Sequence, residues 1–357
     1  MRTVVLALSL FLAMPEASEM LAGIVRQHGG TDAVEVVKQP LPKPGPGEAR
    51  VRIAFAGVNF IDIYLREGAY SSSPPYIPGL EGAGVVESTG PGAEVWLGRR
   101  VAFVHKGAGA YSEFAVVPVT RLVPLGNDVQ LQDAAAVMLQ GLTAQYLLDG
   151  TVRLERNDTV LVHAAAGGTG RLIVQVAKLR GLKVIATVST KAKAAVATAA
   201  GADKVIVSDY SDFATEVLQH TQNRGVAAIF DGVGNRTFLQ GFRCLRPRGG
   251  MVLFGASSGF PPSVDLSVLA GSKFLVRPSL FDFIAEESEL RTRAAAIMDW
   301  LQAEQLNLQM TVLPLADAAC KNWHASQFDK CRSAAPTTIK GKYWQASPQS
   351  WACGGLC

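Results

Sequence analysis

A glycine-rich turn between an apolar strand and a helix constrains the fold more than any other part of this sequence. Residues 160–163 are an apolar run ending in a histidine, and Ala164-Ala165-Ala166-Gly167-Gly168-Thr169-Gly170 follows directly. Glycine lets the backbone approach a pyrophosphate and lets a helix pack closely on a strand, while the helix N-terminus attracts the anion. We therefore predict a dinucleotide-binding turn; the alternative is a tight strand-to-helix turn without a ligand.

Strands and helices alternate around this turn. The sequence predicts apolar strands at 158–163, 183–188, 204–207, 226–230 and 250–254, with helices at 172–179 and 192–200 between them. Strands that are apolar along their whole length are typical of a parallel sheet with both faces covered. The fold class expected here is α/β, with a Rossmann domain built on a doubly wound parallel sheet.

The chain before this domain has a different texture. From residue 20 to about 124 it reads as short strands broken by glycine and proline clusters, as in 41–47, 73–75 and 90–92, which predicts a β-rich domain. An alanine-rich helix is expected from 133 to 148 and a further helix from 286 to 301.

The strand after the glycine turn carries the signal for cofactor choice. An NAD site usually has a carboxylate there, about 20 residues beyond the turn, to bind the ribose. This chain has Ser189, Thr190, Lys191 and Lys193 instead. Two hydroxyls and two ammonium groups suit a 2′-phosphate, so we predict NADP rather than NAD; the alternative is that both lysines are solvated residues at the start of a helix.

Composition excludes several classes of protein. Hydrophobic residues make up 48% of the 357, which excludes a disordered or fibrous chain. The 34 basic and 30 acidic side chains leave +4, and residues 320–357, with five basic residues and one acidic, account for all of it. So small an excess does not predict nucleic-acid binding. Five cysteines, four of them in that tail, are too few for a disulfide scaffold.

The N-terminal segment, residues 1–19, contains an apolar run from 4 to 14 that is too short to span a bilayer. It has the shape of a signal-peptide core but a poor cleavage site. We expect an extension without a structural role, with a signal or a buried extra segment as alternatives. The expected localisation is cytoplasmic, or organellar or secretory if this segment acts as a signal. No stretch predicts a transmembrane helix.

A second glycine-rich segment, Gly79-Leu80-Glu81-Gly82, resembles the medium-chain dehydrogenase/reductase superfamily. The zinc-dependent branch of that superfamily has histidine as a zinc ligand where this chain has Leu80, and leucine cannot bind a metal. The upstream ligand cysteine is also missing from 57–62. We therefore expect no metal.

The chain is similar to the zinc-free quinone oxidoreductases, the zeta-crystallin-like group. The similarity rests on separate blocks in order: 57–64, 109–113, 140–143, 164–170, 231–234, 254–259 and 277–280. It implies a GroES-like β-rich catalytic domain (20–142), a Rossmann NADPH-binding domain (143–280), a return to the first domain (281–319) and a homodimer. Beyond 319 the resemblance ends, and 320–357 are an atypical tail without the periodicity of the family's last helix and strand.

The resemblance also implies the site residues. It places the nicotinamide half of NADPH at Phe60, Asp62, Tyr64 and Tyr146, with Val233, Ser257, Ser258 and Gly259 bordering it, the phosphates at Gly168 and Thr169, and the 2′-phosphate at Ser189, Thr190 and Lys193. Ser208 stands where the family often has a tyrosine, with Tyr210 two residues later.

The activity implied is reduction of a small quinone by NADPH, since the nicotinamide supplies the chemistry and the protein supplies position and polarity. Asn59, Asp62 and Tyr64 are the candidates for orienting the acceptor, although Asp62 can equally be the cap of a helix starting at Ile63. Reduction of an enone or alkenal, and a non-catalytic NADPH-binding role of the crystallin kind, are the alternatives.

Overall fold

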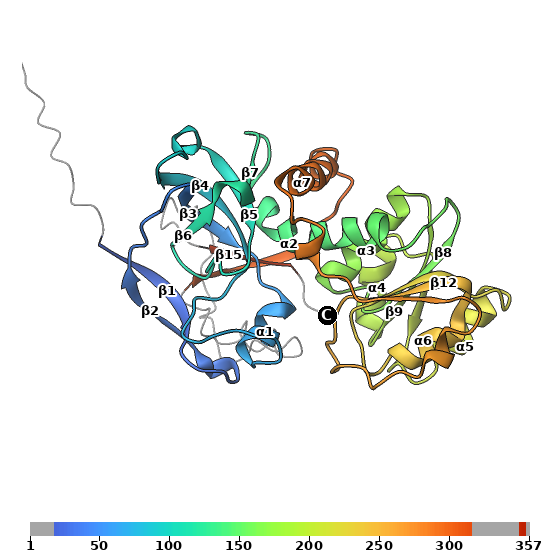
Figure 1. The fold of residues 1–357 in the computed structure, drawn as a ribbon. Coiled ribbons are helices and arrows are strands. Elements are labelled where there is room, and N and C mark those ends of the chain that lie inside the picture. The colour runs from blue at the N-terminus through green and yellow to red at the C-terminus, as the bar shows by residue number, and fades with distance from the viewer. Residues whose placement is uncertain (1–17, 316–349, 355–357) are drawn as a thin grey trace, which may run out of the picture.

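The computed structural model describes residues 18–315 and 350–354, which form two lobes joined by one long helix (Figure 1). In Figure 1 the β-rich lobe is on the left, the parallel sheet is on the right, and α2 (Leu131–Gly150) runs between them. Residues 1–17 and most of the tail lie outside the described chain. No helix in the described part is both long and apolar enough to cross a membrane.

The first lobe is antiparallel. Its main sheet has the order β6-β3-β4-β5-β7, and a separate hairpin pairs β1 with β2. The bounds are β1 (Glu19–Val25), β2 (Val34–Pro40), β3 (Glu48–Ala56), α1 (Phe60–Arg66), β4 (Glu81–Thr89), β5 (Arg100–Val104), β6 (Phe114–Pro118) and β7 (Leu122–Pro124). Burial alternates along β6, as in a half-buried sheet, whereas four consecutive residues of β5 are buried because this strand also packs against α2. This confirms the β-rich lobe expected from the sequence.

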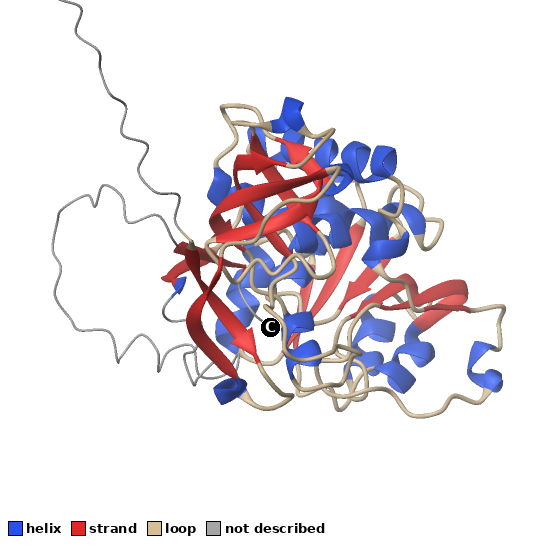
Figure 2. Cartoon of the chain, turned by 60° about the vertical axis from the view of Figure 1, so that its left-hand side comes forward, coloured by secondary structure: helices blue, strands red, loops and turns tan. Residues whose placement is uncertain are grey.

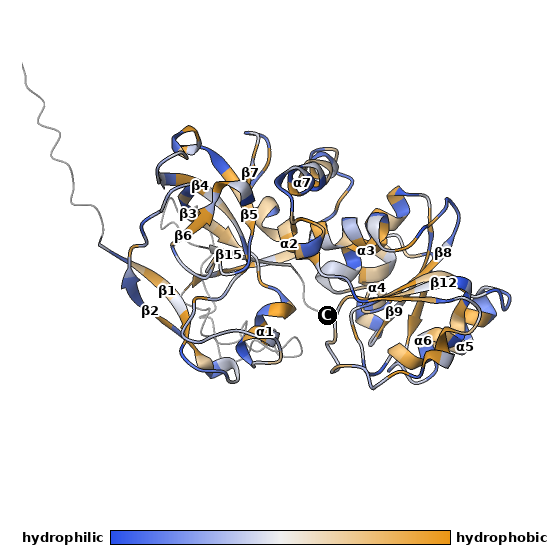
Figure 3. Cartoon of the chain, viewed as in Figure 1, coloured by the Kyte–Doolittle hydropathy of each residue, from blue (hydrophilic) through white to orange (hydrophobic). Residues whose placement is uncertain are grey.

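The second lobe confirms the doubly wound sheet. Six parallel strands lie in the order β10-β9-β8-β11-β12-β13, and Figure 2 shows helices against both faces. The elements are β8 (Thr159–Val162), α3 (Gly168–Leu179), β9 (Lys183–Val188), α4 (Lys191–Ala199), β10 (Lys204–Val207), α5 (Phe213–His220), β11 (Val226–Asp231), α6 (Phe238–Cys244), β12 (Leu245–Leu253) and β13 (Phe274–Val276). Strands of this sheet are coloured largely as hydrophobic (Figure 3), and β11 is buried along its whole length.

Helix α2 is buried nearly all round because it packs against both lobes. It contacts β4 and β5 on one side and α3 and α7 (Glu287–Gln302) on the other. A helix that is apolar on every face is typical of such a position. Helix α2 therefore holds the two lobes against each other, so that side chains from both can line one site.

Several features differ from the sequence-based expectation. Strand β12 begins at Leu245 rather than 250, α3 begins at Gly168 rather than 172, and α5 and α6 have no expected counterpart. The parallel sheet has a sixth strand, β13, which is only three residues long and lies at the edge. Helix α1 begins at Phe60 rather than Ile63. In the tail, β15 (Ser350–Gly354) pairs antiparallel with β14 (Met310–Pro314) and contacts β3, so a strand does close this part of the first lobe. The remaining tail residues lie outside the described chain.

Candidate active site

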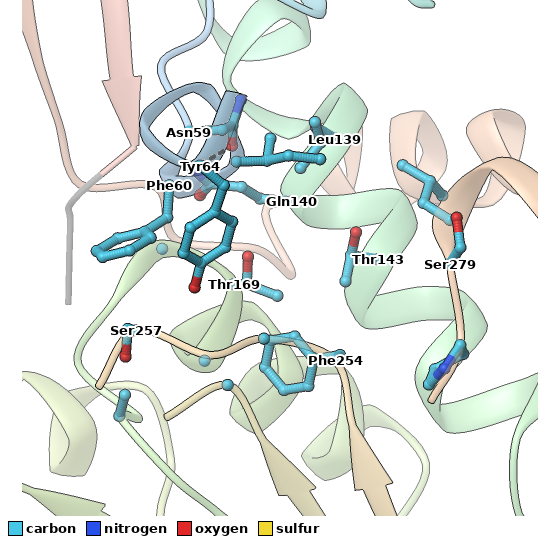
Figure 4. A pocket seen from close by; sticks show the side chains of 18 of the residues that line it. Asn59, Phe60, Tyr64, Leu139, Gln140, Thr143, Thr169, Phe254, Ser257 and Ser279 are labelled. Atoms are coloured by element: carbon cyan, nitrogen blue, oxygen red, sulfur yellow. Dashed lines mark hydrogen bonds between the residues drawn. The ribbon is translucent and has the colours of Figure 1, made fainter. Parts of the chain in front are cut away.

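A cavity of about 220 Å³ lies where α1, α2, the start of α3 and the 254–257 and 278–281 segments converge. Figure 4 shows Phe60 and Tyr64 of α1 and Leu139, Gln140 and Thr143 of α2 on one side, and Phe254 and Ser257 on the other. The lining residues named by the sequence are Asn59, Phe60, Tyr64, Tyr146, Gly168, Thr169 and Ser257. Residues far apart in the chain are thus brought to one cleft between the lobes.

Helix α1 is fixed at its start by Asn59 and Asp62. Asn59 is the N-cap, in extended backbone, and its N–H donates to Asp62 Oδ2 at 2.9 Å. The same oxygen accepts the Tyr111 hydroxyl at 2.9 Å. Burial raises the pKa of Asp62 to about 6. The lining of the main cavity does not include Asp62, because position N3 of the helix turns this side chain towards Tyr111.

A chain of polar contacts runs from β4 to the start of α3. Glu81, which is 1% exposed, accepts Asn59 Nδ2 at 2.5 Å and the Leu139 N–H at 2.5 Å. Asn59 Oδ1 in turn accepts Gln140 Nε2 at 3.0 Å. The carboxamide of Gln140 lies against Gly168, where a Cβ would come within 2.0 Å of Gln140 Oε1. Burial raises the pKa of Glu81 to about 8.

Aromatic side chains form one wall of the cavity and connect the two lobes. The Tyr64 hydroxyl accepts the Ala256 N–H at 3.0 Å. The Tyr64 ring lies 5.1 Å from that of Phe60 and 4.9 Å from that of Tyr70. Tyr146 is almost fully buried and stacks on Phe283 at 4.5 Å. These rings make a wall suited to a flat, mostly apolar molecule.

The glycine turn brings the N-terminus of α3 to this cavity. Ala164 has a positive φ of 50°, and a Cβ on Gly170 would come within 2.4 Å of the Ala164 carbonyl oxygen. The turn can therefore close only with glycine at 170. Gly168, Thr169 and Gly170 line the cavity, so the unpaired N–H groups of the first helical turn lie beside it.

A second cavity, of about 210 Å³, shares Ala164 and Ser257 with the first. Its lining includes Ser189, Lys193, Val233 and Ser258 as expected from the sequence, together with Tyr210 and Arg236. Lys193 Nζ lies 3.4 Å from Ser189 Oγ. The two cavities thus extend from the aromatic wall to a basic end, along the carboxyl ends of the strands.

Besides Asp62, three expected residues, Thr190, Ser208 and Gly259, do not line either cavity. Thr190 is the N-cap of α4, where its side chain accepts the Lys193 N–H at 3.2 Å. Ser208 Oγ accepts the Tyr210 N–H at 2.9 Å, and it is Tyr210 that lines the second cavity. Gly259 has a φ of 101°, and its carbonyl accepts the Asn235 N–H. These residues shape the backbone around the cavities.

Sequence reasoning missed Glu81, Gln140 and Arg236. Glu81 and Gln140 fall inside the segments that carry the family resemblance, but no spacing shows that they meet. Arg236 follows the glycine turn after β11, and nothing in its neighbourhood of the sequence marks it. Within residues 18–315 and 350–354, no three histidine, cysteine, aspartate or glutamate side chains form a group able to hold a metal.

Replacing Glu81 with glutamine should change how stability depends on pH. The folded pKa of about 8 lies above the ordinary 4.5, so the folded chain binds this proton more tightly than the unfolded chain. Glu81 therefore lowers the free energy of unfolding as pH rises from 4.5 to 8, by up to about 1.4 kcal/mol per pH unit. Urea unfolding at the two ends of this interval should show a smaller loss in Glu81→Gln. Equal losses would contradict the assignment.

Comparison with known proteins gives two family matches. Residues 45–127 match the alcohol dehydrogenase GroES-like domain, and 168–296 match the family described as zinc-binding dehydrogenase. The chain is 37% identical to a quinone oxidoreductase of Pseudomonas aeruginosa over 82% of this chain and 91% of that protein. It is 36% identical to a 2-haloacrylate reductase of a Burkholderia species over 84% and 93%.

Solved structures are similar along nearly the whole chain. The Escherichia coli quinone oxidoreductase complexed with NADPH has a TM-score of 0.82 at 31% identity, covering 94% of this chain and 99% of that one. A mycobacterial protein complexed with NADPH has a TM-score of 0.81 at 39% identity, with the same coverage.

Proposed function

Since the chain belongs to the zinc-free quinone oxidoreductase family of medium-chain dehydrogenases and reductases, we propose that it reduces small quinones with NADPH. The observation that carries this proposal is a pair of adjacent cavities, one lined by aromatic and the other by basic side chains, which share Ala164 and Ser257. One end is walled by Phe60, Tyr64 and Tyr70, and the other holds Lys193 and Arg236. NADPH combines a flat nicotinamide with a charged 2′-phosphate, and the cavities provide for both.

The residues of this chain fit NADPH. The N-terminal turn of α3 would bind the pyrophosphate through Gly168 and Thr169, since backbone N–H groups and the helix dipole favour an anion there. Ser189, Lys193 and Arg236 would hold the 2′-phosphate. Bound in this way, NADPH would supply the hydride for the reduction. Val233, Ser257 and Ser258 would lie along the cofactor between its two ends, with Thr190, Ser208 and Gly259 supporting the backbone.

Hydride transfer to a quinone leaves an oxygen anion that would take its proton from water, so the side chains around the acceptor would orient it rather than exchange protons with it. Asn59 and Tyr64 both line the main cavity and can hydrogen-bond to a carbonyl oxygen of a quinone. Such donors stabilise the negative charge that develops on that oxygen during hydride transfer. Asp62 would act through α1, because it accepts the N–H of Asn59 and keeps the start of that helix in place.

Reduction of an activated alkene is the second candidate, favoured by the similarity to a 2-haloacrylate reductase. Both reactions need a flat acceptor held against the nicotinamide. The test is loss of NADPH absorbance with a panel of quinones, enones and 2-haloacrylates. Faster turnover of quinones supports the proposal, and faster turnover of the alkenes replaces it. Tight NADPH binding without oxidation by any acceptor would favour a non-catalytic, crystallin-like protein.

We also propose a homodimer formed through β13. This strand is the edge of the parallel sheet, and Phe274 and Leu275 on it are 59% and 39% exposed. An exposed apolar edge strand is a template for pairing with another chain, and a second copy offers the same edge. Light scattering of the wild-type protein should give a molar mass twice that of one chain. The Leu275→Lys variant should give a molar mass closer to that of a single chain. A monomeric wild-type protein would contradict this proposal.

We make further proposals about the domain limits and the cellular location of the protein. We propose a catalytic domain at 20–142, a Rossmann domain at 143–280 and a return segment at 281–319, with α2 crossing the first limit. We propose that the protein acts in the cytoplasm. We also propose that it acts on small molecules rather than nucleic acids, because the basic and acidic side chains before residue 320 are equal in number. Cell fractionation and a nucleic-acid binding assay test these statements.

A further inference from the structure

We propose that Glu81 is a positioning residue whose protonation reverses the carboxamides of Asn59 and Gln140, and so changes the group that faces NADPH beside Gly168. The inference rests on the proposed function for the identity of the ligand. It concerns a side chain that does not line the cavity itself. Two amide side chains separate it from the start of α3.

The contacts of Glu81 determine which groups donate and which accept in the series of hydrogen bonds from Glu81 through Asn59 to Gln140. Both of its oxygens meet donors, the Leu139 N–H and Asn59 Nδ2, as suits an ionised carboxylate, which only accepts. Asn59 then has its oxygen free to accept Gln140 Nε2 at 3.0 Å. Gln140 Oε1 is left on the side of Gly168, closer to the position of a Cβ there (2.0 Å) than Nε2 is (3.0 Å). The acceptor atom of Gln140 thus lies next to the cofactor-binding turn.

A protonated Glu81 must donate one hydrogen bond, and this requires the opposite arrangement. The Leu139 N–H belongs to the backbone of α2 and continues to occupy Oε2. The O–H is therefore at Oε1, and Asn59 has to present its oxygen instead of its NH₂ group. Asn59 Nδ2 then faces Gln140, which must present its own oxygen. The NH₂ group of Gln140 now lies beside Gly168, so a donor replaces an acceptor.

The carboxyl group of Glu81 has no room to avoid this exchange by moving. A Cβ on Gly57 would lie 2.1 Å from Glu81 Oε1, so the end of β3 packs directly against the carboxyl. Glu81 is 1% exposed, which leaves it no alternative partner in bulk water. An unpaired buried donor or acceptor costs more than turning two amides.

The charged groups around Glu81 leave its ionisation sensitive to pH. Asp62 on α1 is the charge that acts on it, and it favours the protonated form. The elements that pack against β4 carry further titratable or charged residues, namely Glu48, Arg50 and Arg52 of β3, Glu94 of the 94–96 turn, Arg100 of β5, and Asp133, Tyr146 and Asp149 of α2. Arg50 pairs with Glu87 and Arg100 with backbone carbonyls. With burial, these surroundings place the exchange near pH 8.

The test is the dissociation constant of NADPH, measured by fluorescence from about pH 6 to about pH 10. Wild type should show a step near pH 8 of about tenfold, the size of one exchanged hydrogen bond. Glu81→Gln fixes the arrangement of the protonated form, because its NH₂ group must donate to Asn59 Oδ1. It should show no step and match the acidic limit of wild type. Glu216→Gln, an exposed change on α5, should keep the step.

Titration of the 2′-phosphate occurs in every variant, so the difference between variants isolates Glu81. Parallel curves for wild type and Glu81→Gln would overturn the inference. If Glu81→Gln does not fold, Gln140→Leu provides the same test. This change removes the last amide of the hydrogen-bond series and leaves Glu81 ionisable. A step in NADPH affinity that persists in Gln140→Leu would then overturn the inference. Failure to oxidise NADPH with any acceptor would overturn the proposed function and leave this result standing.

Discussion

Replacing Lys193 with glutamate is expected to weaken NADPH binding by about 100-fold and NADH binding by much less. Lys193 lines the second cavity with Ser189 and Arg236, and its ammonium lies 3.4 Å from Ser189 Oγ. A charge-assisted hydrogen bond to a phosphate contributes about 1.5–3 kcal/mol, and the reversed charge adds repulsion. NADH has no 2′-phosphate, so it loses neither. Dissociation constants for both cofactors, measured in the same buffer, give the ratio.

Lys191→Glu is the matched control for this change. Lys191 starts the same helix and is exposed, but it does not line the cavity. A similar loss in both variants would mean that the overall field of α4, rather than contact with the phosphate, attracts the cofactor. Equal losses for NADPH and NADH in Lys193→Glu would show that the 2′-phosphate binds elsewhere. Salt should reduce the effect of Lys191→Glu more, because exposed charges are screened.

Sequence alone predicts the parts of this fold that depend on a local pattern. The sequence predicts strands β8, β9 and β10 to within one residue, because each is a continuous apolar run between helices. Strand β13 has only three residues, and two of them are exposed at a sheet edge, so no such run marks it. A helix start at Ile63 is three residues too late, because Asn59, rather than Asp62, is the cap.

In the candidate site too, features that depend on consecutive residues are predictable from the sequence, and contacts between distant residues are not. The glycine turn could be predicted because its chemistry is contained in consecutive residues, and the structure places it at the start of α3. The chain from Glu81 through Asn59 to Gln140 could not, since its members are 22 and 81 residues apart and meet only when β4, α1 and α2 pack together. Spacing in a sequence gives no signal for contacts of this kind.

Replacing Gly170 with alanine should lower the free energy of unfolding by about 2–3 kcal/mol, the range for forcing extra atoms into a packed site. The new Cβ would lie 2.4 Å from the Ala164 carbonyl oxygen and 3.1 Å from Ala165 Cα, and these are backbone atoms that cannot turn aside. The turn would have to open, which also moves the α3 N-terminus away from the position proposed for the pyrophosphate. Urea unfolding and NADPH titration of the variant measure the two effects. Gly45→Ala is the control, because there the nearest atom is the flexible end of Glu48 at 3.2 Å.

Gly168→Ala separates these two effects from each other. Its Cβ would come even closer to a neighbour, 2.0 Å from Gln140 Oε1, but that atom is the end of a side chain and can swing away. Alanine is also a better helix former than glycine, and Gly168 is the first residue of α3. Gly168→Ala should therefore keep the stability of the fold while displacing Gln140 and weakening NADPH binding. If it destabilised the protein as much as Gly170→Ala, contact with backbone would not be what requires glycine at 170.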